Sequence, residues 1–433
     1  MLHYSFKPFE QLEEIHQLPD PFLKPDDTRI SNADEWPQQR QYLKEMLAYY
    51  LYGEMPPSPG NVRGSVLESR AVDGQKAVEE NIRITFGPEN ALSMDFQLLR
   101  PVTDKKCPVL IWNVFAQEEC PVAGELLEHG IALIRFNKEQ LGVDSHAFYH
   151  QSPCLKAYPT YSWRAIAVWA WGYSRIIDYL EQRDDIDTDK IAVTGYSRNG
   201  KVALCAAIYD ERIAVAVPCG SGCGGSGNFR FLGGRLGKDT GMQETIGSMS
   251  QMFPFWWADG LREFGVGKEL PPIDIDAVLQ AENPFQELLS RIDFSINGKI
   301  GPEYRLPFDM HFARALVAPR PLLTTDSLDD EWANPYGIQI SWRASAEVYK
   351  MLGVLDNDAM FFREGYHTFS LADWTAVADF LYLHLLPEQN IQPRSIFVTM
   401  KIPEDVEADR INNMTSKWYC RYPHFDWRAP AAD

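Results

Sequence analysis

The chain lacks a long hydrophobic run. In its 433 residues the longest apolar stretches, such as residues 165–172 (AIAVWAWG), are far shorter than the roughly 20 residues that a membrane-spanning helix needs. No membrane partner is therefore expected. The N-terminus, MLHYSFKPFEQLEE, also lacks the basic start and the apolar stretch of a signal peptide. We expect the chain either to be intracellular or to have lost a leader.

Cysteine and positive charge are also scarce. The 7 cysteines are too few and too irregularly spaced for a disulfide framework. Cys219 and Cys223 are the two cysteines closest in sequence, but no matching pair of His or Cys lies nearby. A zinc site is therefore not expected. No metal or cofactor is expected. With 41 Lys and Arg against 60 Asp and Glu, the net charge is −19, which argues against the basic face that a nucleic acid requires.

The chain has no internal repeat, and its hydrophobic content of 45% suits a substantial core. Short β-branched segments alternate with helical patterns such as 163–180 and 201–209, which indicates βαβ units and a mostly parallel sheet. The predicted strands of this part of the chain are residues 109–112, 131–134, 191–194, 214–217, 321–324 and 359–362.

Two segments depart from this alternation. Residues 1–100 combine a helical stretch at 36–51 with strands near 62–84 and 93–99, and we expect them to be an N-terminal extension packing on one domain that spans 1–433. Residues of about 220–318 are too many for one crossover. They are predicted to be an insertion that shapes the site at the carboxyl edge of the sheet. We expect the aromatic residues 253–257 to form the core of this insertion and not to contact the substrate directly.

One serine lies where a strand pattern changes to a helix pattern. In KIAVTGYSRNGKVALCAA (residues 190–207), Ser197 is flanked by Gly195 and Gly200. A nucleophile elbow has this character, because a strained strand-to-helix turn needs small neighbours. An ordinary strand–turn–helix connection explains the same glycines, and G-x-S-x-x-G is not the full elbow pattern. These residues alone leave both readings open.

A serine nucleophile needs a general base, and in sheet-based hydrolases the chain order is serine, acid, histidine. Four histidines follow the serine. His311 precedes the strand expected to carry the acid, His384 lies in an apolar helix, and His424 lies in an irregular tail. His367 follows directly after a predicted strand in FFREGYHTFSLADW, and we expect it to be the base.

The acid is expected after the strand at 321–324. The segment PLLTTDSLDDEW supplies Asp326, Asp329, Asp330 and Glu331. A charged cluster at such a place is usually a solvated loop, so most of these carboxylates are expected to face water. Local sequence leaves the choice among the three aspartates open.

Several segments resemble carbohydrate esterase family 15, the glucuronoyl esterases. GYSRNGK (195–201) is similar to that family's elbow, which often reads G-C-S-R-x-G-K. SGCGGSGNFR (221–230), DDEWANPYG (329–337) and REGYHTFSLADW (363–374) resemble later family segments in the same order. The resemblance implies a three-layer α/β-hydrolase fold that cleaves esters between 4-O-methyl-glucuronic acid on xylan and lignin alcohols. It also implies a secreted or periplasmic location, and we expect a monomer.

The resemblance also implies roles for individual residues. It matches Ser197 to the nucleophile, His367 to the base and Arg198 to an arginine that polarises the carbonyl oxygen. It matches three further residues to the sugar side: Lys201 to a lysine that holds hydroxyls, Trp332 to a wall of the uronate pocket, and Glu244 to a sugar-binding glutamate.

The acid departs from the commonest pattern of that family. Many members carry it as the glutamate of E-S-G-x-G-G, and the matching residue here is Gly220. Other bacterial members resemble this chain in having an aspartate two residues before the tryptophan, which is Asp330. The expected triad is therefore Ser197, His367 and Asp330.

Two alternatives remain open. Another acyl hydrolase of the same fold, such as an acetyl xylan esterase or a broad carboxylesterase, fits the triad, although a small acetyl group gives no reason for both Arg198 and Lys201. A catalytically silent carbohydrate-binding protein is the other alternative. The missing glutamate favours it, and the retention of a serine, a histidine and an aspartate opposes it.

Overall fold

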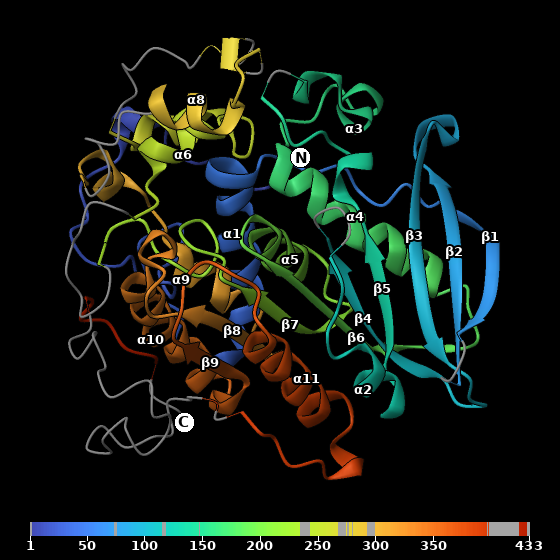
Figure 1. The fold of residues 1–433 in the computed structure, drawn as a ribbon. Coiled ribbons are helices and arrows are strands. Elements are labelled where there is room, and N and C mark those ends of the chain that lie inside the picture. The colour runs from blue at the N-terminus through green and yellow to red at the C-terminus, as the bar shows by residue number, and fades with distance from the viewer. Residues whose placement is uncertain are drawn as a thin grey trace.

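A computed structural model of the chain describes residues 2–72, 76–114, 118–146, 148–233, 243–266, 274, 277–278, 280–291, 299–395, 397 and 424–430. Within these residues lies a nine-stranded sheet in the order β1-β2-β3-β5-β4-β6-β7-β8-β9 (Figure 1). Strands β5, β4 and β6 to β9 pair in parallel, and β1 to β3 extend one end of the sheet with antiparallel pairs. The strands are β1 (Arg63–Val72), β2 (Ala77–Phe86), β3 (Leu92–Pro101), β4 (Cys107–Asn113), β5 (Ala132–Phe136), β6 (Ile186–Tyr196), β7 (Ile213–Cys219), β8 (Leu322–Ser327) and β9 (Asp358–Arg363).

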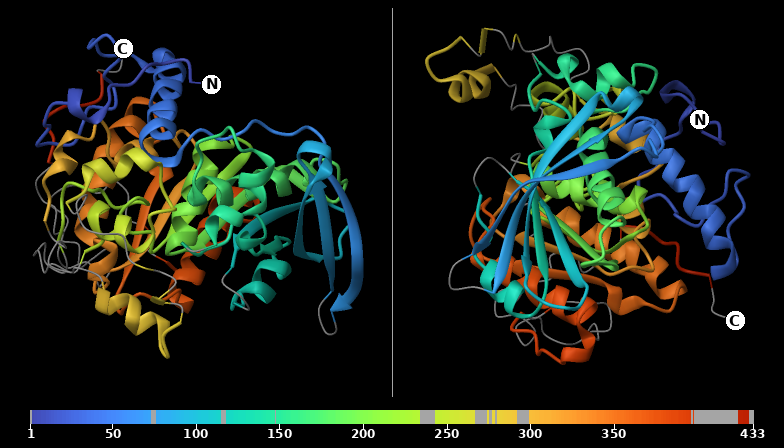
Figure 2. Two further views of the ribbon diagram at one scale, coloured as in Figure 1. Left: turned by 90° about the horizontal axis from the view of Figure 1, so that it is seen from above. Right: turned by 90° about the vertical axis from the view of Figure 1, so that its right-hand side faces the viewer.

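Helices cover both faces of the sheet, as Figures 1 and 2 show. Successive side chains of a strand point to opposite faces. Accordingly Val109 and Ile111 of β4 join the core under α4, α5, α9 and α10, and Leu110 and Trp112 join the core under α2 and α11. The helices are α1 (Trp36–Leu47), α2 (Ala123–Glu128), α3 (Pro153–Ala157), α4 (Ala165–Leu180), α5 (Arg198–Tyr209), α6 (Ile246–Met252), α8 (Pro284–Arg291), α9 (Met310–Ala315), α10 (Pro335–Met351) and α11 (Leu371–Leu385).

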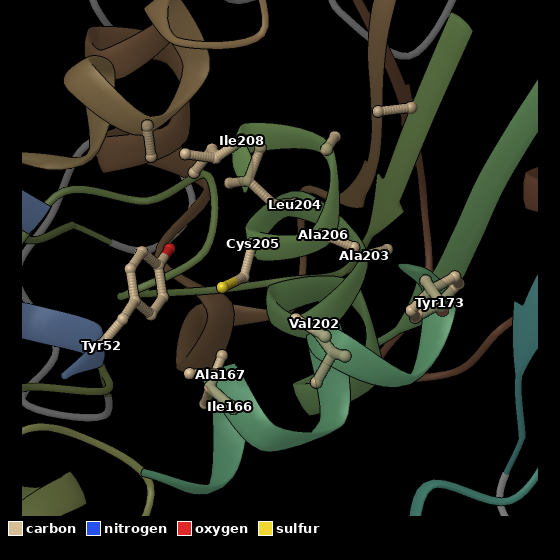
Figure 3. Close-up of a cluster of buried hydrophobic side chains, with 14 of the residues drawn as sticks. Tyr52, Ile166, Ala167, Tyr173, Val202, Ala203, Leu204, Cys205, Ala206 and Ile208 are labelled. Atoms are coloured by element: carbon tan, nitrogen blue, oxygen red, sulfur yellow. The ribbon is translucent and has the colours of Figure 1, made fainter. Parts of the chain in front are cut away.

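Helix α5 is buried along almost its whole length. Residues 199–208 are all buried. Figure 3 shows its side chains packed among neighbours that include Ile166 and Ala167 of α4 and Tyr52 of the N-terminal segment. A helix that is apolar on all sides is enclosed by the protein. Its N-terminus, where Ser197 lies, is therefore held in place by the core.

The N-terminal segment around Leu18 contacts the last described segment of the chain, residues 424–430. The backbone N–H of Leu18 donates to the carbonyl of His424 over 2.9 Å. The indole N–H of Trp427 donates to the carbonyl of Leu18 over 2.8 Å. Among the described residues, no helix is long and apolar enough to cross a membrane.

The expected mostly parallel α/β fold is confirmed, because each predicted strand between 109 and 362 overlaps one of β4 to β9. The predicted helices at 163–180 and 201–209 are α4 and α5. Residues 63–101, expected within an N-terminal extension, form β1 to β3 of the same sheet. They do so because β3 pairs antiparallel with β5, which gives the end of the parallel sheet a hydrogen-bonding partner.

Candidate active site

Ser197 lies on the turn between β6 and α5. Its backbone angles are φ 58° and ψ −125°, a conformation rare for a residue with a side chain. A Cβ atom at Gly195 would overlap the carbonyl oxygen of Asn199, and one at Gly200 would lie 2.7 Å from the carbonyl oxygen of Cys219. Both glycines are therefore required by the tight turn, which is the geometry of a nucleophile elbow.

The serine lies at one end of a chain of hydrogen bonds. Nε2 of His367 is 2.8 Å from Oγ of Ser197, and Nδ1 of the same imidazole is 2.5 Å from Oδ2 of Asp330. The Asp330 side chain is 3% exposed and the His367 side chain is 36% exposed. The loops after β8 and β9 thus bring the expected acid and base to the expected nucleophile.

The other two candidate aspartates, Asp326 near the end of β8 and Asp329 in the loop that follows, have different surroundings. Asp329 accepts a hydrogen bond from the backbone N–H of Gly365 over 3.1 Å. Asp326 is buried, and its two carboxyl oxygens have no hydrogen-bond partner among the described residues. Burial raises the pKa of Asp326 to about 8, although the charge of Arg314 opposes the rise.

The raised pKa of Asp326 predicts a pH-dependent stability. The unfolded carboxyl ionises near about 4 and the folded one near about 8, so the folded protein holds the extra proton between these values. The contribution of Asp326 to the free energy of unfolding should therefore fall as pH rises from about 4 to about 8. We expect Asp326→Asn to raise Tm by a few °C at pH 9 and by much less at pH 5, measured by circular dichroism. Equal Tm differences at both pH values would contradict this.

Tyr196 explains why Gly220 bears no acid. Gly220 has φ +51°, and a Cβ atom there would lie 2.5 Å from Cε2 of the Tyr196 ring. That ring lies beside His367, with ring centroids 4.9 Å apart, and stacks on Phe369. A side chain at position 220 would overlap the tyrosine, so the carboxylate for His367 comes from the next strand end.

Arg198, expected to polarise the carbonyl oxygen, is held from two sides. Its Nη1 lies 3.1 Å from Oδ2 of Asp144. Its guanidinium lies 4.9 Å from the ring centroids of both Phe253 and Trp256. Burial disfavours ionisation of Asp144, but the charges of Lys138 and Arg198 outweigh it and lower its pKa. The carboxylate stays charged and fixes the guanidinium of the residue that follows the serine in the chain.

Lys201 and Glu244, both expected on the sugar side, form a buried ion pair. Nζ of Lys201 lies 2.8 Å from Oε2 of Glu244. The same ammonium donates to the carbonyls of Ser221 over 2.7 Å and Cys223 over 2.8 Å. Lys201, which the resemblance matches to a lysine that holds hydroxyls, is 2% exposed, because the glycine-rich loop after β7 lies over the start of α5.

Trp332 is half-buried and lies in the short helix Glu331–Ala333, directly after Asp330. Its backbone carbonyl accepts from the N–H of Glu244 over 3.0 Å. This bond joins the aspartate–tryptophan segment to the Lys201–Glu244 pair. The aromatic segment 253–257 is mainly core, as predicted, since Trp256 and Trp257 are 2% and 3% exposed.

Sequence reasoning missed Asp144 and Lys138. They form an ion pair of 3.0 Å, and the indole N–H of Trp256 donates to the same carboxylate over 3.4 Å. Both residues follow β5 at the carboxyl edge of the sheet, and that position was the available signal. Within the described part of the chain, no group of three or more His, Cys, Asp or Glu side chains could hold a metal ion.

The parallel sheet with helices on both faces, and a serine on a strained turn at its carboxyl edge, define an α/β-hydrolase. The family model "Glucuronyl esterase, fungi" matches residues 84–285 and 293–353, which is more than half of the chain. The chain therefore belongs to the glucuronyl esterase family.

Individual relatives agree with this assignment. A carbohydrate esterase from an unknown prokaryotic organism is 25% identical over 86% of this chain and 90% of its own length. A 4-O-methyl-glucuronoyl methylesterase of Phanerochaete carnosa is 28% identical over 81% of this chain and 76% of its own. The structure of a family 15 glucuronoyl esterase from Caldicellulosiruptor kristjansonii is 26% identical, with a TM-score of 0.66 over 89% of this chain and 93% of that one.

Proposed function

We propose that the chain is a serine esterase that hydrolyses 4-O-methyl-glucuronoyl esters, including those that link glucuronoxylan to lignin alcohols. The observation that carries the proposal is the pair of cations on the first turn of the helix that Ser197 begins. Arg198 and Lys201 are three residues apart, so they share one face of α5. Arg198 adds charge near the ester carbonyl, and Lys201 holds Glu244 as an acceptor for a sugar hydroxyl, for which a small acetate has no use. The methylesterase activity named for the Phanerochaete carnosa relative also supports this substrate.

The chemistry follows from the hydrogen-bonded chain of Ser197, His367 and Asp330. Oγ of Ser197 attacks the ester carbonyl carbon while Nε2 of His367 takes the hydroxyl proton. The tetrahedral intermediate collapses, the C–O bond to the alcohol breaks, and His367 returns the proton to the leaving oxygen. Water then attacks the acyl-enzyme, with the imidazole again as base, and releases the uronic acid. Asp330 holds the tautomer with the proton on Nδ1 and stabilises the imidazolium.

The developing oxyanion needs donors at the start of α5. The backbone N–H groups of the first helical turn have no carbonyl partner within the helix, and the N–H after the nucleophile is a usual oxyanion donor. That residue is Arg198, whose guanidinium adds a positive charge held by Asp144. Charge placed beforehand at the oxyanion stabilises the transition state without reorganisation.

The sugar ring is proposed to bind on the other side of the serine, against Trp332. A half-exposed indole provides a flat apolar wall for a pyranose ring. The Lys201–Glu244 pair supplies a carboxylate acceptor for a sugar hydroxyl. Because Lys201 already donates to three protein acceptors, its main part is to hold Glu244 and the loop of residues 221–223.

The sugar site predicts a substrate-dependent loss. Trp332→Ala should lower kcat/KM for a methyl ester of 4-O-methyl-glucuronic acid by about 10- to 100-fold, as expected for the loss of about 1.5–3 kcal/mol of apolar burial against the indole. Hydrolysis of p-nitrophenyl acetate by the same variant should change by less than about 3-fold, because this substrate has no sugar ring. An equal loss on both substrates would show that Trp332 supports the triad loop instead of the uronate.

A further inference from the structure

The loop that bears His367 is wrapped around one arginine. Arg363, the last residue of β9, is 6% exposed. Its Nη1 donates to the backbone carbonyls of Glu364 over 3.0 Å and Tyr366 over 3.4 Å, and its Nη2 donates to the carbonyl of Thr368. The acceptors lie on both sides of His367 in the chain. One guanidinium thus binds the backbone before and after the imidazole.

The same arginine is fixed to the start of α11. Its Nε donates to Oδ2 of Asp373 over 2.6 Å. That oxygen also accepts from the backbone N–H of Ser370 over 2.8 Å and from its hydroxyl over 2.7 Å, which completes the capping box of the helix. Since α11 packs in the core on one face of the sheet, Arg363 ties the loop to a rigid element.

The backbone of the loop fits around the guanidinium. Gly365 has φ +100°, and a Cβ atom there would lie 3.3 Å from Nη1 of Arg363. On the other side, the hydroxyl of Ser327 donates to the carbonyl of Gly365, and Asp329 accepts from its N–H. Tyr366 is 78% exposed, so its side chain adds little apolar packing. The loop of residues 364–368 is therefore held by hydrogen bonds, and Arg363 makes the largest number of them.

We propose that Arg363 is a positioning residue for His367, which sets the loop of residues 364–368 so that the imidazole reaches Ser197 and Asp330 together. The inference rests on the proposed function, in which His367 is the general base. Arg363 acts through His367 and does not itself touch the substrate. Its loss frees three carbonyls and leaves Asp373 without its cation. The imidazole then moves away from Ser197, and displacements of about 1 Å in a catalytic group lower rates by about 100-fold.

Arg320 offers a matched control. It is also largely enclosed, and its guanidinium donates to four backbone carbonyls, those of Ala207, Asp210, Ile213 and Val317. It precedes β8, whereas Asp330 follows that strand, so Arg320 lies at the opposite end of the sheet from the serine. Removing Arg320 tests the general effect of losing a backbone-binding arginine.

The test compares Arg363→Ala and Arg363→Lys with Arg320→Ala in the full chain. The measurements are the rate at which a fluorophosphonate probe labels Ser197, kcat and KM for the glucuronate methyl ester, and Tm. We expect Arg363→Ala to slow both labelling and kcat by about 100-fold, with KM changed by less than about 3-fold. Added guanidinium should restore part of the labelling rate. Arg320→Ala should lower Tm and leave the labelling rate unchanged.

Three outcomes would overturn the proposal. The first is wild-type labelling by folded Arg363→Ala. The second is a slow rate that Arg320→Ala matches and that guanidinium does not restore. If Arg363→Ala does not fold, Arg363→Lys is measured instead, because its ammonium keeps the charge and cannot bind all four acceptors. The third outcome that would overturn the proposal is wild-type labelling by Arg363→Lys. A wild-type protein that labels but does not hydrolyse the glucuronate ester would refute the proposed substrate alone, since labelling requires no sugar.

Discussion

Ser197→Ala is expected to lower kcat for glucuronate methyl ester hydrolysis by about 10⁶-fold, the loss seen when a triad serine is removed. The hydroxyl is the group that forms the acyl-enzyme, and the nearby N–H donors and Arg198 cannot replace it. Alanine keeps the backbone of the turn, because its Cβ atom occupies the position of the serine Cβ atom at φ 58°. Release of the uronic acid, followed by chromatography, measures the loss.

A surface serine provides the control for this variant. Ser58 donates through its hydroxyl to Asp178 over 3.1 Å, and Ser58→Ala should hydrolyse the ester at the wild-type rate. Tm of Ser197→Ala should remain within about 2 °C of wild type, since surface and loop substitutions outside the core rarely exceed about 0.5 kcal/mol. Turnover by Ser197→Ala above about 1% of wild type would mean that another group is the nucleophile.

The fold and the tight turn at Ser197 were predictable because their signals are local, although the glycines alone did not separate an elbow from an ordinary turn. Alternation of β-branched and helical segments identified β4 to β9, and the two glycines around Ser197 reported a turn whose neighbours leave no room for a Cβ atom. His367 was also predictable, since a histidine just after a strand lies at the carboxyl edge of a parallel sheet.

The surroundings of Arg198 and Lys201 were not predictable, because they depend on contacts between distant segments. Asp144, which holds Arg198, lies 54 residues earlier in the chain. The carbonyls that enclose Lys201 belong to a loop about 20 residues later, and only the path of that loop over α5 reveals that the ammonium is buried. Neither contact leaves a periodic pattern in the sequence.

Arg363 and Tyr196 were missed for a related reason. Each has an ordinary local reading, Arg363 as a strand-end charge and Tyr196 as an aromatic strand residue. Their parts in the site come from backbone geometry: the loop of residues 364–368 turns toward the guanidinium, and Gly220 leaves the space that the tyrosine ring fills. A sequence pattern records residue types and does not record which space a ring occupies.

Asp330→Asn is expected to lower kcat by about 10⁴-fold while the protein stays folded. The amide keeps the shape of the carboxyl group and can still accept from the N–H of Ala333, as Asp330 does over 3.3 Å. It cannot stabilise the imidazolium, and its NH₂ group favours the tautomer with the proton on Nε2, which prevents His367 from taking the serine proton. The labelling rate of Ser197 should fall together with kcat, whereas KM for the glucuronate ester should change little.

Asp329→Asn and Asp326→Asn are the controls, because both residues lie close to Asp330 in the chain and lack the contact with Nδ1 of His367 that Asp330 makes. Each should retain activity within about 10-fold of wild type. An amide oxygen at position 329 can still accept from the N–H of Gly365, and the Asp326 carboxyl makes no hydrogen bond with the described residues. If Asp330→Asn kept near-wild-type activity and one of the two control variants lost its activity, that control residue would be the catalytic acid.

Adding Gly220→Glu to Asp330→Asn should restore no activity, since the Tyr196 ring occupies the space beside Gly220. Recovery of activity in the double variant would show that the Tyr196 ring moves and leaves room for the glutamate carboxylate.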